Sequence, residues 1–296
     1  MAIACEFEYF KPKTVEEALK LLARYGSRGR VLAGGTNLVG WLKDGLIAPE
    51  ALVDIKGLKD LGKIALKDGV VFIGALVTFN ELIASSLVKS KLPLLWEAAR
   101  TVGSKGLRNR ATMVGNICAA VPCCDAGPAL LAYEAKVLVK APEGGRRIPA
   151  GGWFLGPKKP ALKDGELALG VEIPLPPKRQ GGCYAKLGRY KGEDLAQASV
   201  AVLALPRNEC RVAFGAVGPR PFRSRKIEAL LSVKKPDASV IEKAKRLVDG
   251  EIRPITDVRA SKEYRSHMVK VMLGRAVTAA VSRLAGKGPA YGESVL

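Results

Sequence analysis

Val31-Leu-Ala-Gly-Gly-Thr-Asn-Leu38 carries the strongest indication of the fold, because two glycines directly follow a short apolar run. Glycine has no Cβ, so the backbone amides of Gly34 and Gly35 can approach an anion closely. Consecutive amides of this kind form a concave nest for phosphate. Thr36 and Asn37 add side-chain donors. Taken alone, the motif is equally typical of a tight structural turn.

Two familiar nucleotide-binding loops do not match this stretch. It is not GxGxxG, and no acidic residue follows about 20 residues later in a Rossmann context. It is not GxxxxGK[ST] either. A phosphate-binding role therefore has to be supported by other motifs.

Hydrophobic periodicity and capping signals predict the elements around the motif. Thr14-Val-Glu-Glu17 and Thr78-Phe-Asn-Glu81 are capping boxes. Helices are predicted over residues 14–25, 38–43, 78–85, 93–101, 128–134, 227–231, 238–248 and 261–285. Strands are predicted over residues 7–10, 31–33, 52–55, 70–73, 136–140, 168–173, 184–187, 199–205 and 211–217.

The best boundary signal is Pro174-Leu-Pro-Pro-Lys-Arg-Gln-Gly-Gly182, which is rich in proline and glycine. We expect two α/β units over residues 1–55 and 56–176. Residues 177–296 are expected to form an α+β unit with a three-stranded antiparallel sheet and helices.

Composition indicates an ordinary globular chain. Of its 296 residues, 48% are apolar, and no apolar run approaches the roughly 18 residues of a membrane span. The first residues show no signal-peptide pattern, so we expect a cytoplasmic protein without a transmembrane segment.

The charge is strongly positive. Lysine and arginine number 48 against 28 acidic residues, a net charge of +20. The cations are scattered and aromatic residues are only 6%, which favours a solvated basic surface, or a protein partner with an acidic face, over nucleic acid. Arg220, Arg223, Arg225 and Lys226 form a cluster that we expect at such an interface.

The cysteines and the single histidine do not indicate a metal centre. Cys118, Cys123 and Cys124 lie close in sequence, but their spacing matches no zinc or ferredoxin pattern. We interpret them as buried or pocket-lining thiols. His267 is the only histidine and is expected on a surface helix, which argues against a Ser-His-Asp triad.

Two further motifs carry polar chemistry. Thr112-Met-Val-Gly-Asn116 places a glycine and small polar residues before Asp125, which can accept from a ribityl or ribose hydroxyl or can cap the helix predicted over 128–134. In Lys186-Leu-Gly-Arg-Tyr-Lys-Gly-Glu-Asp-Leu-Ala196, Lys186 or Arg189 can stabilise an anionic cofactor. A charged hairpin explains this second stretch equally well.

Together and in this order, the three motifs resemble the FAD-binding medium subunit of molybdenum hydroxylases. That family includes carbon monoxide dehydrogenase, xanthine dehydrogenase, and aldehyde and nicotinate oxidoreductases. The resemblance covers nearly the whole chain. It implies a vanillyl-alcohol-oxidase-type FAD-binding fold, in which two α/β subdomains hold FAD and the C-terminal domain closes over the flavin.

The resemblance also implies roles for individual residues. The first two motifs match loops around the pyrophosphate, Asp125 matches a carboxylate on the flavin's polar chain, and Lys186 matches a flavin-facing cation. Ala168 or Leu169 matches an apolar contact. The implied FAD-binding residues are Val31, Leu32, Ala33, Gly34, Gly35, Thr36, Asn37, Leu38, Val102, Thr112, Met113, Val114, Gly115, Asn116, Asp125, Leu169, Lys186, Asp194 and Leu195. Val114 departs from the family, which usually has glycine there.

The family's division of labour implies the function. A large molybdopterin subunit oxidises the substrate, a small [2Fe-2S] subunit relays electrons, and FAD passes them to NAD, a quinone, oxygen or another acceptor. We therefore expect an FAD-containing oxidoreductase subunit with no general base, no nucleophile and no metal ligands of its own. The alternatives are a self-contained reductase resembling UDP-N-acetylenolpyruvoylglucosamine reductase, whose catalytic Ser and Glu pattern is not found, and a basic nucleic-acid-binding module.

Overall fold

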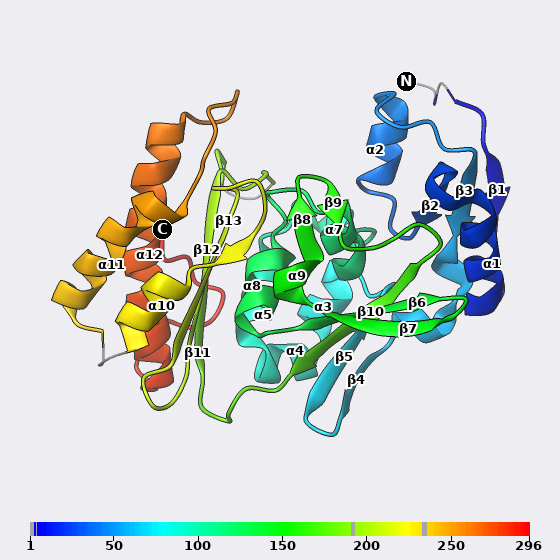
Figure 1. Cartoon of the computed structure of the whole chain (residues 1–296). Helices are drawn as coiled ribbons and strands as arrows, with labels where there is room; N and C mark the ends of the chain where they lie inside the picture. Colours follow the sequence, from blue (N-terminus) through cyan, green and yellow to red (C-terminus); the bar gives the residue numbers. More distant parts are fainter. Residues whose placement is uncertain (1–2, 4, 191–192, 233–235) are drawn as a thin grey trace.

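The computed structural model describes residue 3 and residues 5–190, 193–232 and 236–296. Three main sheets follow one another along the chain, and helices separate and cover them (Figure 1). No helix of the described part is long and apolar enough to cross a membrane. Lys191 and Gly192, in the third motif, lie outside the described residues.

The first sheet is parallel and small. Its strand order is β1-β3-β2, from Glu8–Phe10, Ala51–Asp54 and Gly29–Leu32. Helix α1 (Val15–Tyr25) buries Ala18, Leu19 and Leu22, and the Thr14 side chain caps it by accepting from the amide of Glu17, as the capping box predicts. Strand β2 leads directly into the glycine loop and α2 (Leu38–Lys43). The 3₁₀ turns η1, η2 and η3 cover Gly26–Arg28, Ile55–Gly57 and Lys59–Gly62.

The second sheet is antiparallel throughout. Its order is β4-β5-β10-β6-β7, from Ile64–Lys67, Val70–Gly74, Leu167–Pro174, Lys136–Ala141 and Gly144–Pro149. The predicted α/β unit thus contains helices but no parallel pairing. Both edge strands were missing from the prediction because neither shows an alternating apolar face: all of β7 except Ile148 is exposed.

Along the described chain, seven helices and a short hairpin lie between the strands of this sheet. The helices are α3 (Phe79–Ala84), α4 (Ser86–Lys91), α5 (Pro93–Arg100), α6 (Lys105–Arg108), α7 (Met113–Ala119), α8 (Ala126–Ala132) and α9 (Ala150–Trp153); the hairpin is β8 (Phe154–Gly156) with β9 (Lys159–Pro160). Trp153 is fully buried, and its indole N–H donates to the carbonyl of Ile117 at 2.9 Å. The core of the chain's first half is therefore built around these helices.

The last sheet has four strands, so the predicted three-stranded sheet is corrected. Strands β11 (Gly181–Leu187), β12 (Ala198–Ala204) and β13 (Cys210–Gly215) are joined by β14 (Phe222–Arg223). Two residues are too few to show a period, and β14 is recognisable only by its pairing with β13. Helices α10 (Arg225–Ser232), α11 (Ala238–Glu251) and α12 (Lys262–Leu284) cover one face (Figure 1).

The opposite face of this sheet forms the interface between the two halves of the molecule, residues 1–176 and 177–296. Helices α5 and α8 of the first half pack against β11, β12 and β13. Every residue of β12 is buried, as expected for a central strand covered on both faces. His267 is exposed on α12, as predicted.

Candidate functional site

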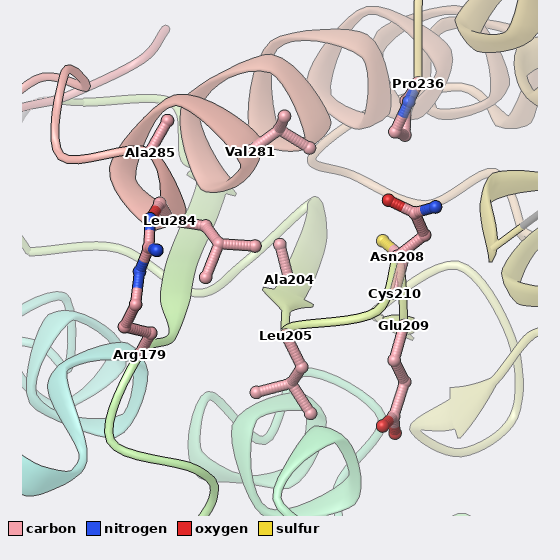
Figure 2. A pocket seen from close by; sticks show the side chains of 10 residues that line it. All are labelled: Arg179, Ala204, Leu205, Asn208, Glu209, Cys210, Pro236, Val281, Leu284 and Ala285. Atoms are coloured by element: carbon pink, nitrogen blue, oxygen red, sulfur yellow. The ribbon is translucent and has the colours of Figure 1, made fainter. Parts of the chain in front are cut away.

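A cleft of about 920 Å³ lies in the described part of the chain, near the upper end of the 300–1,000 Å³ typical of ligand pockets. Its walls come from the loop after β2, the start of α7, the segment 158–168 and residues 193–195. A second hollow of about 200 Å³ lies between α12 and the β12–β13 connection (Figure 2). Of these two hollows, the cleft is the one large enough for a dinucleotide.

The glycine loop presents free backbone donors to this cleft. Within the described part of the chain, the amides of Gly34, Gly35 and Thr36 donate to no protein acceptor. Gly35 has φ +77°, a conformation that favours glycine. Gly34 and Gly35 are partly buried and Thr36 is exposed, and three successive amides without protein partners form a nest that is suited to bind an anionic ligand.

The first and second motifs meet backbone to backbone. A Cβ on Gly34 would lie 1.8 Å from the carbonyl oxygen of Arg110. Two residues further on, Thr112 caps α7 by accepting from the amide of Gly115 at 3.0 Å. The sequence motifs therefore form neighbouring parts of one wall, although nearly 80 positions separate them.

Val114 fits its position without strain. It lies in the first turn of α7, where a Cβ is normal, and its side chain is 2% exposed. Asn116, two residues further on, accepts from the thiol of Cys124 at 3.0 Å and from the amide of Ala126 at 3.3 Å. The side chain at position 114 is thus compatible with the cleft wall, and Asn116 ties α7 to the start of α8.

Asp125 forms a buried ion pair and is not a helix cap. Its Oδ2 lies 3.0 Å from Lys186 Nζ, and its Oδ1 accepts from the hydroxyl of Tyr184 at 3.0 Å. Both charged side chains are 8% exposed, and Lys186 also donates to the carbonyl of Thr101 at 2.8 Å. Burial raises the pKa of Asp125, while the ammonium of Lys186 opposes that rise. The alternative that Asp125 caps α8 is wrong, because its side chain makes no capping bond.

The structure separates the other predicted residues into two groups. Most of them line the cleft: Val31, Ala33, Gly34, Gly35, Thr36, Asn37, Leu38, Val102, Thr112, Val114, Gly115, Asn116, Asp125, Asp194 and Leu195. Four do not: Leu32, Met113, Leu169 and Lys186. Met113 is fully buried in the core, Lys186 stands behind Asp125, and Ala168 rather than Leu169 lines the cavity.

The loop after β11 borders the opening of the cleft. Asp194 accepts from the amides of Arg189 at 2.5 Å and Leu195 at 2.8 Å. The guanidinium of Arg189 lies 3.5 Å from the Asp194 carboxylate and stacks over Tyr190. Both cations considered from the sequence are therefore linked to cleft-lining carboxylates, Lys186 to the buried Asp125 and Arg189 to Asp194. Leu195 is 47% exposed.

Sequence reasoning missed the wall formed by residues 158–168. Lys158, Lys159 and Lys163 line it, and Lys158 lies over the ring of Trp41, which also lines the cleft. Lys158 and Lys159 make no ion pair within the described residues, so their charge is available to an anionic ligand. Three lysines within six positions were a visible signal, but an exposed turn explains such a run equally well.

The thiols lie where the sequence predicted. Cys118 and Cys123 line the cleft, and Cys124 is fully buried. Burial raises the pKa of Cys118 to about 12, so the group is a neutral thiol at physiological pH. The described part of the chain holds no cluster of three potential metal ligands.

Comparison with known proteins identifies the family. Residues 5–176 match the model of the FAD binding domain in molybdopterin dehydrogenase, and residues 183–280 match that of the CO dehydrogenase flavoprotein C-terminal domain. The chain belongs to the FAD-binding medium subunits of molybdenum hydroxylases. Its cofactor is FAD, and it is an FAD-containing oxidoreductase subunit. This assignment replaces the self-contained reductase and the nucleic-acid-binding module.

Individual relatives agree over almost their full length. The chain is 34% identical to the carbon monoxide dehydrogenase medium chain of Hydrogenophaga pseudoflava, over 94% of this chain and 98% of that one. It is 31% identical to the xanthine dehydrogenase FAD-binding subunit of Escherichia coli O157:H7, over 94% and 97%. A solved carbon monoxide dehydrogenase from Hydrogenophaga pseudoflava superposes with a TM-score of 0.92, covering 96% of this chain and 99% of that one at 34% identity.

Proposed function

We propose that this subunit holds one FAD noncovalently in the cleft and passes electrons from a [2Fe-2S] subunit to an external acceptor. The substrate is oxidised on a large molybdopterin subunit. The observation that carries the proposal is the set of free amides at Gly34, Gly35 and Thr36, placed in one cavity with the buried Asp125–Lys186 pair. FAD, when bound, accepts two electrons and releases them again.

Each wall of the cleft suits one part of the dinucleotide. The free amides and the lysines of segment 158–168 offer donors and positive charge to the pyrophosphate. Asp125 accepts hydrogen bonds, which suits the hydroxyls of the polar chain. Val102 and Ala168 supply apolar wall. The chain's own work is to bind, orient and shield the flavin, and no residue is needed as a base or nucleophile.

Units 1–55, 56–176 and 177–296 remain our proposal for the domains. The two family models, which end and begin at residues 176 and 183, support the second boundary. The first boundary is supported by the change from a parallel to an antiparallel sheet after β3.

The direct test uses the isolated chain and its flavin content. We expect one FAD per chain, released as free FAD by acid precipitation. Flavin that stays on the denatured protein would refute the noncovalent part, and a chain that binds no FAD would refute the whole assignment of the cleft. Co-purification with [2Fe-2S] and molybdopterin subunits, measured through the metal content of the complex, tests the proposed partners.

A further inference from the structure

The segment that follows α12 folds back onto the interface between the two halves of the molecule. There it surrounds Arg283, whose side chain is 3% exposed. Nε donates to the carbonyl of Pro289 at 2.9 Å. One terminal nitrogen donates to the carbonyl of Gly182 at 2.6 Å, and the other to that of Ala290 at 2.9 Å.

Arg283 also faces Glu97 on α5: one terminal nitrogen donates to a carboxylate oxygen at 3.0 Å, and the other lies 2.9 Å from the second oxygen as an ion-pair contact. Glu97 is 5% exposed, and it also accepts from the amides of Tyr184 and Gly292, each at 2.9 Å. The guanidinium lies 4.3 Å from the ring centroid of Tyr291. We call Glu97, Arg283 and segment 288–292 the clamp.

Every polar group of the clamp's ion pair is satisfied. Arg283 donates four hydrogen bonds and makes one further ion-pair contact with Glu97, and each oxygen of Glu97 accepts from a backbone amide and lies against the guanidinium. Replacing a buried ion pair by apolar side chains is often neutral or stabilising, so the presence of such a pair is weak evidence for stability. A fully bonded pair does fix geometry, because each bond restricts the direction of the next.

The geometry that the clamp fixes is that of α5 against β11. Tyr184, on β11, gives its amide to Glu97 and its hydroxyl to Asp125 in the cleft. Lys186, two residues further along β11, bridges Asp125 and the carbonyl of Thr101, the residue that ends α5. A continuous set of hydrogen bonds between α5 and β11 therefore connects the clamp to the cleft wall.

We propose that Glu97, Arg283 and segment 288–292 are positioning elements for the cofactor. They set the place of Asp125 and Lys186 and thereby the affinity of the cleft for FAD. This inference rests on the proposed assignment of the cleft as the FAD site. It adds that a segment outside both FAD loops, and outside the cavity, controls the binding of the cofactor.

The sharpest variant is Gly292→Val in the full chain. Gly292 has φ +92°, and a Cβ there would lie 1.7 Å from the Arg100 guanidinium and 3.2 Å from the Trp96 ring. The Arg100 side chain can move away, so the backbone strain of a β-branched residue at this φ, together with the contact to Trp96, should displace segment 288–292 while the Glu97 and Arg283 side chains remain unaltered. Glu293→Gln is the matched control, because Glu293 directly follows Gly292 and its side chain is exposed. Tyr291→Phe is a milder second variant, since it removes only the hydroxyl that accepts from the amide of Gly182.

FAD titration and a double-mutant cycle with Tyr184→Phe test the proposal. We expect Gly292→Val to raise the FAD dissociation constant about tenfold, the effect of losing one hydrogen bond to a charged group, and to shift the absorption spectrum of the bound flavin. Tyr291→Phe should act in the same direction, and Glu293→Gln should change neither quantity. Because both changes act on Tyr184, Gly292→Val combined with Tyr184→Phe should be no worse than the stronger single variant.

Two results would overturn the inference. One is a variant that melts earlier but binds FAD with unchanged affinity and spectrum, which is the outcome for a purely structural role. The other is strict additivity in the cycle. If Gly292→Val does not fold, Tyr291→Phe decides by the same criteria. A wild-type chain that fails to bind FAD would instead refute the proposed function, so the two failures are distinguishable.

Discussion

Gly34→Ala is expected to separate the two FAD loops. The new Cβ would lie 1.8 Å from the carbonyl oxygen of Arg110, whereas non-bonded heavy atoms stay at least 3.0 Å from a real Cβ. The clashing atom belongs to the backbone, so no side chain can rotate away and one loop has to retreat by more than about 1 Å. Overpacking of this kind costs about 1–3 kcal/mol. If this free energy is lost from the binding of FAD, the FAD dissociation constant rises about 5-fold to 150-fold.

Gly35→Ala is the matched control for this variant. Its Cβ would meet only side-chain atoms, at 3.1 and 3.3 Å, although φ +77° adds backbone strain. Both variants should be titrated with FAD, followed by flavin fluorescence, and their apo forms compared by thermal unfolding. We expect the loss of affinity to be larger for Gly34→Ala. Wild-type affinity in Gly34→Ala would show that the contact with Arg110 does not shape the pyrophosphate site.

Three further changes test the charges and thiols. Lys186→Met leaves Asp125 buried without its partner and should lower stability by about 3–5 kcal/mol, with much of the loss recovered in the double variant with Asp125→Asn. Burial raises the pKa of Asp125 in the folded chain, so the folded state loses stability as the pH rises and Asp125 ionises. Without the ammonium of Lys186 this loss should be greater, so the melting temperature of Lys186→Met should fall further below that of the wild type at pH 8 than at pH 5. Cys118, with a pKa of about 12, should react with iodoacetamide faster as pH rises towards that value and more slowly with FAD bound; equal rates would place it outside the site. Reversing the charges of Arg225 and Lys226 should slow assembly with partner subunits at low salt more than at high salt, and an unchanged rate at low salt would exclude this surface from the interface.

Arg223 is left out of that last variant because the structure places it inside. Its side chain is 9% exposed and is bonded to Glu228 at 2.7 Å and to Glu134 at 2.7 Å. Arg220 donates to the carbonyl of Phe154 at 2.5 Å. The sequence shows four nearby cations but not which of them a following strand and helix will enclose. Arg225 and Lys226 keep side chains that are 70% and 76% exposed, and Arg220, although it is exposed, is engaged by the carbonyl of Phe154.

Local signals predicted most elements of the fold. The capping box at Thr78 is complete in the structure, with bonds in both directions between Thr78 and Glu81. Edge strands such as β7 were not predicted, because pairing with a neighbour and not burial of one face makes them strands. The antiparallel order of the second sheet was missed for a related reason: β5 pairs with β10, nearly 100 residues later, and no local pattern encodes that partner.

In the candidate site too, some residues could be predicted from local motifs, whereas others depend on contacts with residues distant in the sequence. Motif order indicated the cofactor and most of the residues along the cleft. The partner of Asp125 was not predictable, because the nearest local explanation, a helix cap, is chemically reasonable and the actual partner is 61 positions away. Lys186 lies within bonding distance of Asp125 because β11 packs against α5.

Contacts between segments that are distant in the sequence also couple cofactor binding to folding. Gly34 meets Arg110, Asp125 meets Lys186, and Glu97 meets Arg283 across 186 positions. The last two contacts join segments that approach only when the two halves of the molecule are packed together, so neither exists in an isolated half, whereas Gly34 and Arg110 both belong to the first half. A ligand that binds this arrangement and not the unfolded chain must stabilise the packing of the halves by the same free energy with which the packing favours the ligand. FAD should therefore strengthen the contact of α5 with β11 as well as the two loops, and weakening that contact should weaken FAD binding.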